Sequence, residues 1–209
     1  KHMKENATVK TCDLPPQASK EFHYQHGNAS LVGALQKLAM DWVGSNNLAP
    51  LQGVGEFGTC GMQGHDCAAD RYTSIRRHTL FSLVHRPADR DIHTLITRQN
   101  DEVEPMFLHS VIPWWAVNGA SGIATGFSVN FQGSNPIWVV DWIRMWLEGN
   151  DSIQPYPIPY VHGFKGSVHR QSSNSEALEY VGVFEEQQCD DDCDYQIAIV
   201  TEIPPHTAF

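Results

Sequence analysis

Residues 30–43, SLVGALQKLAMDWV, contain the clearest structural pattern in the chain. Their large apolar side chains recur at intervals of three and four residues: Leu31, Leu35, Leu38 and Trp42. This spacing places them on one face of an α-helix. Asn28 or Ser30 can cap the start of the helix, and Gly44 can end it. The stretch therefore predicts an amphipathic helix that packs through one apolar face.

A second helix is predicted over residues 137–147. Its shared face carries Trp138, Trp142, Met145 and Trp146. Pro136 precedes it and Gly149 follows it, as is typical of helix boundaries. Between the two helices, residues 75–84 and 92–97 alternate in polarity, which predicts two strands of a hairpin.

Further strands are predicted over residues 103–117, 126–131, 180–184 and 195–203. Strands and helices follow one another without regular βαβ units, which favours an α+β fold with a mainly antiparallel sheet. We expect a single compact domain over residues 4–209 with two principal helices, at about 30–43 and 137–147. Residues 1–3, Lys-His-Met, are typical of a cloning remnant.

The composition is that of a folded protein. The 209 residues are 41% hydrophobic and 18% charged, which argues against disorder and fits one domain. No apolar run approaches the roughly 18 residues that cross a membrane. Residues 45–70 are rich in glycine and predict a long ordered loop, and such loops are often functional.

The five cysteines indicate export. Cys60 and Cys67 form one close pair, and Cys189 and Cys193 form another, while Cys12 is left over. Small disulfides in loops are common outside reducing compartments. We therefore expect a secreted or periplasmic protein whose signal peptide has been removed, although four cysteines allow three pairings that the sequence does not distinguish.

Charge is distributed unevenly along the chain. The net charge of -10 disfavours nonspecific binding of nucleic acid. Six of the eight arginines nevertheless lie within residues 71–98, together with only two aspartates. Arg71, Arg76 and Arg77 predict a site for an anionic small molecule, because guanidinium groups pair with phosphate or carboxylate. Alternatively, this segment faces residues 176–202, which hold nine acidic residues and no basic one.

The segment Tyr24-Gln25-His26-Gly27-Asn28 precedes the first predicted helix. It resembles the His-Gly-Thr segment of the histidine–tyrosine–glutamate class of ADP-ribosyl transferases and NAD-consuming toxins, with Asn28 in place of the usual threonine. The resemblance implies an NAD-like substrate and a catalytic role for His26. It places the partner residues at Tyr160 and at Glu185 or Glu186. A structural role for His26 at the helix start is the alternative.

These features together predict a secreted hydrolase or group transferase that acts on a nucleotide- or NAD-like substrate. His26, His78, Glu185 and Glu186 are the expected catalytic residues, and Arg71, Arg76, Arg77 and Trp115 are expected to bind the substrate. RNA cleavage by paired histidines is a variant of this hypothesis, because such pairs perform acid–base catalysis.

Two other functions remain open at this point. The protein is a secreted module that binds a glycan or a protein through its tryptophans, or it is an amidase or protease that uses Cys60 or Cys67 as nucleophile. No cofactor is required by the first hypothesis. The acidic residues Asp190, Asp192 and Asp194 offer oxygen ligands for calcium, whereas no histidine set has the spacing of a zinc site.

Overall fold

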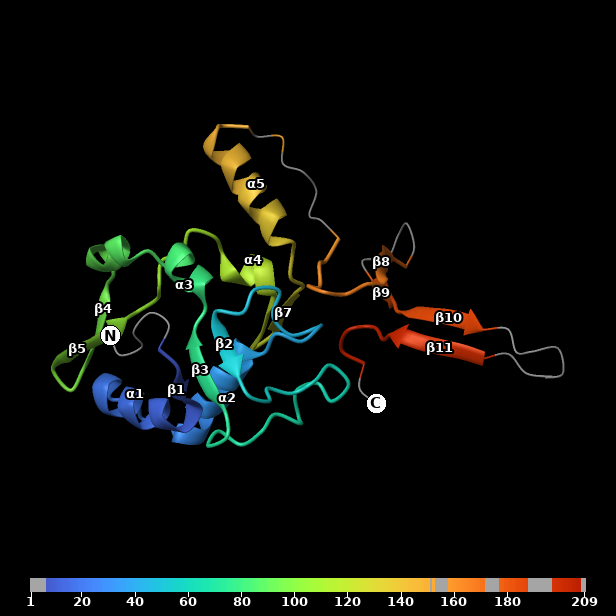
Figure 1. Ribbon diagram of the computed structural model, residues 1–209. Coiled ribbons are helices and arrows are strands. Elements are labelled where there is room, and N and C mark those ends of the chain that lie inside the picture. The colour runs from blue at the N-terminus through green and yellow to red at the C-terminus, as the bar shows by residue number, and fades with distance from the viewer. Residues whose placement is uncertain (1–6, 151, 153–157, 172–176, 188–196, 208–209) are drawn as a thin grey trace.

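The computed structural model combines helices with antiparallel strand pairs, as the α+β prediction expects (Figure 1). It describes residues 7–150, 152, 158–171, 177–187 and 197–207. Every strand pairing among these residues is antiparallel. No helix in these ranges is long and apolar enough to cross a membrane.

A three-stranded sheet and two helices form the N-terminal part. The strands have the order β1 (Val9–Lys10), β3 (Ser74–Arg77), β2 (Leu51–Val54), and the helices are α1 (Leu14–Phe22) and α2 (Asn28–Ala39). Ile75 lies at the centre of the sheet, opposite Val9 on one side and Gly53 on the other. It is fully buried and packs in a cluster with Ala39, Leu51 and Phe57. This apolar cluster fixes the helices against the sheet.

A five-residue turn joins α1 to α2. His23 adopts a left-handed conformation that ends α1, and Ser19 Oγ donates a hydrogen bond to Asn28 Oδ1 across the turn at 3.0 Å. Asn28 is therefore the first residue of α2 and not its cap, which is Gly27. The helix ends four residues earlier than predicted, because the Asn46 side chain donates to the carbonyl oxygens of Lys37 and Met40.

A helical segment and a short hairpin follow the sheet. Their bounds are α3 (Thr79–Val84), the 3-10 helix η2 (Pro87–Ile92), β4 (Leu95–Arg98) and β5 (Asp101–Pro105). The predicted strand over residues 75–84 is correct only as far as Arg77. The side chain of His78 accepts a hydrogen bond from the Leu80 amide and starts a helix there. The predicted hairpin of residues 75–84 with 92–97 is consequently wrong, since β3 pairs with β2 and β4 pairs with β5.

The next part holds the second long helix and a projecting hairpin. The elements are α4 (Trp114–Asn118), β6 (Ala120–Ala124), β7 (Phe127–Phe131) and α5 (Pro136–Leu147). Asn135 caps α5 by accepting from the Ile137 amide at 2.9 Å. Ala116, Val117 and Val139 form a second buried cluster between α4 and α5. The strand predicted over residues 103–117 is therefore wrong from Met106 onward, because β5 ends at Pro105 and residues 114–118 form α4.

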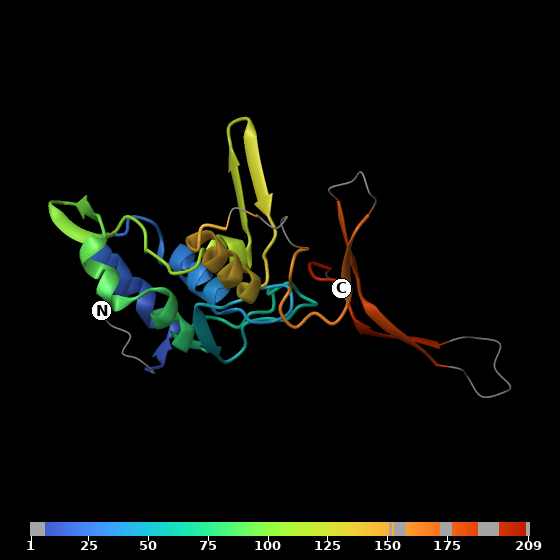
Figure 2. The same cartoon turned by 90° about the horizontal axis from the view of Figure 1, so that it is seen from above.

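Two hairpins complete the described chain: β8 (Ser167–Arg170) with β9 (Leu178–Val181), and β10 (Val183–Gln187) with β11 (Ile197–Glu202). In both views the β10–β11 hairpin extends from the end of the molecule opposite α1, α3 and β4 (Figures 1 and 2). Among the described residues, the acidic strands β10 and β11 therefore do not face the arginine-rich segment, as the alternative required.

The predicted disulfide between Cys60 and Cys67 is absent, since the thiols of Cys12, Cys60 and Cys67 are all free. Hydrogen bonds hold the loop instead: Gly64 N–H donates to Thr59 O at 3.0 Å, and Gln63 N–H donates to Cys60 O at 3.1 Å. Cys189, Cys193 and the predicted calcium ligands Asp190, Asp192 and Asp194 lie outside the described residues.

Candidate functional site

Arg71 and Tyr72 occupy an exposed turn immediately before β3. Tyr72 is 69% exposed, which makes it the most exposed of the tyrosines that the structure describes. The Arg71 guanidinium lies 4.8 Å from the centre of the Tyr72 ring. The arrangement presents a phenol hydroxyl to solvent beside a permanent positive charge.

The backbone beneath this turn is held firmly. Thr73 is completely buried, and its hydroxyl donates to the hydroxyl of the equally buried Thr11 at 2.9 Å. The Thr11 amide donates to Thr73 O at 3.1 Å, and the Tyr72 amide donates to Ala69 O at 2.8 Å. An exposed side chain is therefore mounted on a fixed backbone.

Residues 55–70, called here the 55–70 loop, lead into the turn without regular secondary structure. Asp66 accepts two hydrogen bonds from Thr59, at 2.9 Å from the amide and 2.7 Å from the hydroxyl. These bonds lower the pKa of Asp66, because they stabilise its carboxylate form. The two ends of the loop meet where the Ala68 amide donates to Glu56 O at 3.1 Å.

Arg76 and Arg77, the predicted anion-binding residues on β3, differ in their contacts. Arg76 Nε donates to Gln52 Oε1 at 2.9 Å. Arg77 Nε is buried without a hydrogen-bond partner among the described residues, in a pocket lined by Leu14, Leu35 and Phe81. Arg71 is thus the predicted arginine that is exposed at the turn.

The start of α2 is open to solvent. Residues 25–30 are all exposed, including His26, whose ring makes an edge contact with Tyr24 at 5.2 Å. No side chain caps this end of the helix. Free backbone amides at a helix N-terminus favour anions, so this surface attracts phosphate groups.

The β6–β7 hairpin projects as a narrow arm from the helices (Figure 2). Ile123 is 93% exposed and Phe127 is 80% exposed near its tip. The two-residue turn between the strands contains Gly126 at φ 78°, a conformation that glycine adopts without strain. The arm therefore presents large apolar side chains to solvent at its tip.

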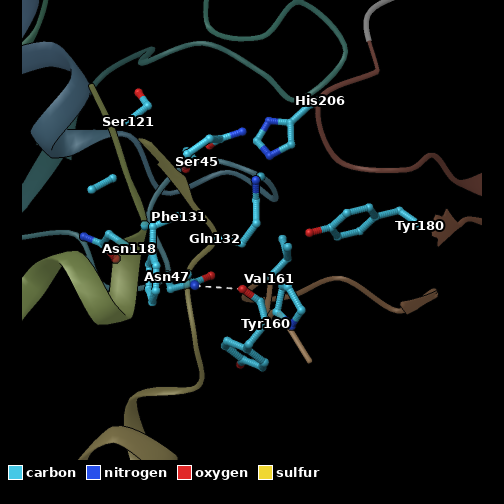
Figure 3. A pocket seen from close by; sticks show the side chains of 16 residues that line it. Ser45, Asn47, Asn118, Ser121, Phe131, Gln132, Tyr160, Val161, Tyr180 and His206 are labelled. Carbon is cyan, nitrogen blue, oxygen red and sulfur yellow. Dashed lines mark hydrogen bonds between the residues drawn. The ribbon is translucent and has the colours of Figure 1, made fainter. Parts of the chain in front are cut away.

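The base of this arm borders a polar cavity of about 470 Å³ (Figure 3). Asn47 holds three segments together there: its Nδ2 donates to Val117 O at 2.7 Å and to Tyr160 O at 2.8 Å, and its Oδ1 accepts from the His162 amide at 2.8 Å. Asn118 is similarly engaged with both backbone groups of Leu48. The side-chain amides of Asn47 and Asn118 therefore stabilise the segments at the base of the arm.

The predicted catalytic residues do not converge. His26 lies before α2, and the Nδ1 atom of His78 accepts a hydrogen bond from the Leu80 amide at the start of α3. Glu185 and Glu186 lie on β10, at the far end of the molecule in both views. The sequence resemblance thus joined residues that the fold separates.

The surroundings of Trp115, Cys60 and Cys67 do not favour the roles predicted for them. Trp115 is 55% exposed on α4 and contacts Phe131 edge-on at 4.9 Å. Burial raises the pKa of the Cys60 and Cys67 thiols, with nearby carboxylates adding to the effect. A raised pKa leaves less thiolate, which is the opposite of an activated cysteine nucleophile.

A comparison with protein families gives a match over nearly the whole chain. The model for the DNA gyrase/topoisomerase IV family of A subunits matches residues 2–208. The chain belongs to this family. DNA topoisomerase 2 of the yeast Meyerozyma guilliermondii is 34% identical over 95% of the chain, and mouse DNA topoisomerase 2-alpha is 35% identical over 79%. The chain spans 14% and 11% of the lengths of these two topoisomerases.

A solved structure agrees with this topoisomerase assignment. The Plasmodium falciparum topoisomerase II DNA-binding, cleavage and re-ligation domain superposes with a TM-score of 0.78 and 26% sequence identity. The match covers 87% of this chain and 24% of that domain. The mixed helical and antiparallel fold described above is therefore a topoisomerase II fold.

The topoisomerase family corrects several predictions. A secreted or periplasmic hydrolase, an NAD-consuming toxin, a glycan-binding module and a cysteine protease are all wrong, because the relatives are DNA topoisomerases. The predicted partners, an anionic small-molecule substrate and no nonspecific binding of nucleic acid, are wrong for the same reason. The error was to use the net charge, although the local charge of residues 71–98 is positive.

Sequence reasoning selected Arg71 but missed Tyr72, which follows it, and Ile123 on the β6–β7 arm. Tyr72 follows an arginine at the end of a glycine-rich stretch, a pattern that carries little information without the fold. Ile123 was missed because it falls between the strands predicted over residues 103–117 and 126–131. The dipeptide Thr125-Gly126 is the better indicator, since glycine often follows a polar residue in a two-residue hairpin turn.

Proposed function

We propose that this chain supplies the DNA-binding, cleavage and re-ligation surface of a type II topoisomerase, with Tyr72 as the nucleophile. The observation that carries the proposal is the exposed Tyr72 beside Arg71 on a fixed turn, in a chain of the topoisomerase family. The likeness to a domain described as one for DNA binding, cleavage and re-ligation supports the same reaction.

The chemistry of reversible DNA cleavage favours a tyrosine. Re-ligation without an added energy source requires that the energy of the broken phosphodiester be kept in a covalent bond to the protein. The Tyr72 oxygen attacks the DNA phosphorus, its proton leaves, and one deoxyribose oxygen departs as a hydroxyl group. In re-ligation that hydroxyl attacks the phosphotyrosine, and the Tyr72 phenol is regenerated.

Arg71 contributes charge to this reaction. An arginine guanidinium carries a delocalised positive charge and can form two parallel hydrogen bonds to phosphate oxygens. Its position 4.8 Å from the Tyr72 ring centre places that charge beside the ring that carries the attacking oxygen. We assign Arg71 to holding the phosphate while negative charge develops on its oxygens.

Helices α1 and α2, with their short turn, are similar in layout to a helix-turn-helix, and β2 and β3 follow them. The exposed residues 25–30 at the start of α2 fit the edge or backbone of a DNA groove. His26 keeps a role in this proposal, as a DNA contact in place of a catalytic base. Glu185 and Glu186 have none, because like charge repels the DNA backbone.

The β6–β7 arm adds an apolar contact. Proteins that bend DNA commonly insert an apolar side chain between base pairs and unstack them. Ile123, with 93% of its surface exposed at the arm, has the exposure and chemistry for this role. We assign it to the bending of the cleaved DNA segment.

Enzymes of the topoisomerase II family normally use Mg²⁺. The described residues of this chain contain no group of three or more His, Cys, Asp or Glu side chains that fits a metal ion. The match of the family model to residues 2–208 supports the treatment of residues 4–209 as one unit.

The test replaces Tyr72 with phenylalanine in the complete enzyme. Tyr72→Phe lacks the attacking oxygen and is expected to abolish covalent protein–DNA adducts, while the dissociation constant for DNA stays within about twofold because the ring remains. Tyr160→Phe is the matched control, since the Tyr160 hydroxyl is hydrogen-bonded to His162. Adduct formation by Tyr72→Phe at the wild-type level refutes the proposal.

A further inference from the structure

We propose that the Thr59–Asp66 pair is a positioning element for Tyr72, which sets the rate of DNA cleavage without touching DNA. This inference rests on the proposed function. It assigns a role to a pair of side chains in the 55–70 loop that the reaction described above does not use.

The pair closes the loop with two hydrogen bonds to one carboxylate. Asp66 Oδ1 accepts from the Thr59 amide at 2.9 Å, and Asp66 Oδ2 accepts from the Thr59 hydroxyl at 2.7 Å. Hydrogen bonds to an ionised group are about twice as strong as those between neutral groups. The carboxylate therefore fixes two residues seven positions apart in the chain.

The position of Asp66 is passed to Tyr72 through the next few residues. Two residues after Asp66, the Ala68 amide donates to Glu56 O at 3.1 Å, and Ala68 O accepts from Gln36 Nε2 of α2 at 3.1 Å. Ala69 O then accepts from the Tyr72 amide at 2.8 Å. A shift of Asp66 thus moves the carbonyl group to which the Tyr72 backbone is bonded.

The 55–70 loop has little room to absorb such a shift. A Cβ atom at Gly58 would lie 2.6 Å from the Gly64 Cα atom and 3.0 Å from Asp66 Oδ1. Gly58 also has φ +87°, a conformation that other residues rarely adopt. The two sides of the loop are therefore packed backbone against backbone around the Thr59–Asp66 pair.

The charge of the loop excludes a direct role in DNA binding. Residues 55–70 contain Glu56, Asp66 and Asp70 and no lysine or arginine, so the loop does not attract the phosphate backbone. The Asp66 carboxylate is occupied by Thr59 on both oxygens. Its effect on cleavage therefore acts through the position of the turn.

Thr59→Val in the complete enzyme tests this role. The variant loses the 2.7 Å hydroxyl bond and keeps the 2.9 Å amide bond, while the matched control Thr59→Ser keeps both. We expect Thr59→Val to cleave DNA about tenfold more slowly in a single turnover, because one charge-assisted bond is lost. The DNA dissociation constant stays within about twofold of wild type, and Thr59→Ser cleaves at the wild-type rate.

Asp66→Asn provides a second variant. Its amide retains one acceptor and gains a donor for the Thr59 hydroxyl, so both contacts remain without the charge. Because bonds to a charged group are about twice as strong as neutral ones, we expect a loss of rate similar to that of Thr59→Val. Cleavage by Thr59→Val at the wild-type rate overturns the inference. So does an equal loss of DNA affinity and of rate together with a lower melting temperature, which indicates general unfolding.

Tyr72→Phe, measured alongside, separates the two proposals. If Tyr72→Phe still forms adducts, the proposed function fails, whatever the Thr59 and Asp66 variants do. If Tyr72→Phe is inactive while Thr59→Val matches wild type, only the positioning role fails.

Discussion

Replacing Ile123 with alanine removes three carbon atoms from a side chain that is 93% exposed. Nothing in the folded protein buries this side chain, so the stability of the fold is expected to stay unchanged. If the side chain is inserted between base pairs, the variant loses about 0.8 kcal/mol for each buried carbon, or about 2.4 kcal/mol in total. Since about 1.4 kcal/mol corresponds to a factor of ten, DNA binding is expected to weaken about 50-fold.

Two measurements on a labelled DNA duplex test this expectation at one fixed salt concentration. Fluorescence anisotropy gives the dissociation constant, and energy transfer between dyes at the two ends reports the bend. Ile137→Ala is the matched control, because Ile137 is the same residue type and is 70% exposed on α5. An Ile123→Ala variant that binds and bends DNA as the wild type does would refute the wedge role. An equal loss in Ile137→Ala would show that the effect is not specific to the arm.

Three further outcomes are expected. Ile75→Ala, at the fully buried centre of the sheet, should lower the free energy of unfolding by about 2–5 kcal/mol in urea titrations, and a loss below about 1 kcal/mol would contradict the core assignment. Cys60 and Cys67 should react with iodoacetamide without prior reduction, but more slowly at pH 8 than free cysteine, because burial raises both thiol pKa values. The hydrogen bonds of the Thr59–Asp66 pair should be intact above the usual aspartate pKa of about 3.9. They should be lost only as the pH falls through the lowered pKa of Asp66. An NMR titration in which the Thr59 amide shifts near pH 5 would contradict this direction.

Helices α2 and α5 could be predicted from the sequence because their signals are local, whereas α1, α3 and α4 were not predicted. Residues 137–147 carry one apolar face between Pro136 and Gly149, and α5 spans Pro136–Leu147. The end of α2 could not be predicted in the same way. It is set by Asn46, whose side chain takes up the last carbonyl groups of the helix.

Strand predictions failed where one side chain changes the backbone. Residues 75–84 alternate in polarity throughout, yet His78 caps a helix and ends the strand after Arg77. The pairing partners were also wrong, since β3 joins β2 across the long 55–70 loop. Sequence periodicity indicates that a strand exists, but it does not indicate which strand it pairs with.

The functional predictions failed because they relied on the net charge of the whole chain and on the number and spacing of its cysteines. The net charge of -10 indicated that nonspecific binding of nucleic acid is disfavoured. However, β10, which carries Glu185 and Glu186, lies far from β3, the strand that follows Arg71 (Figure 1). Arg71 was chosen as a basic residue of the site, and the proposed function retains it. Tyr72 was missed because its importance depends on exposure and on a fixed backbone, and neither is visible in the sequence.

The contacts of Asn47 determine how late in synthesis this part of the fold can form. Its Oδ1 atom accepts from the backbone of His162, which lies 115 positions later in the chain. At about 5–20 residues per second, a ribosome needs about 6 to 23 s to reach that residue after Asn47 has been incorporated. During that interval the nascent chain has no native partner for this atom, so the base of the β6–β7 arm is completed late in synthesis.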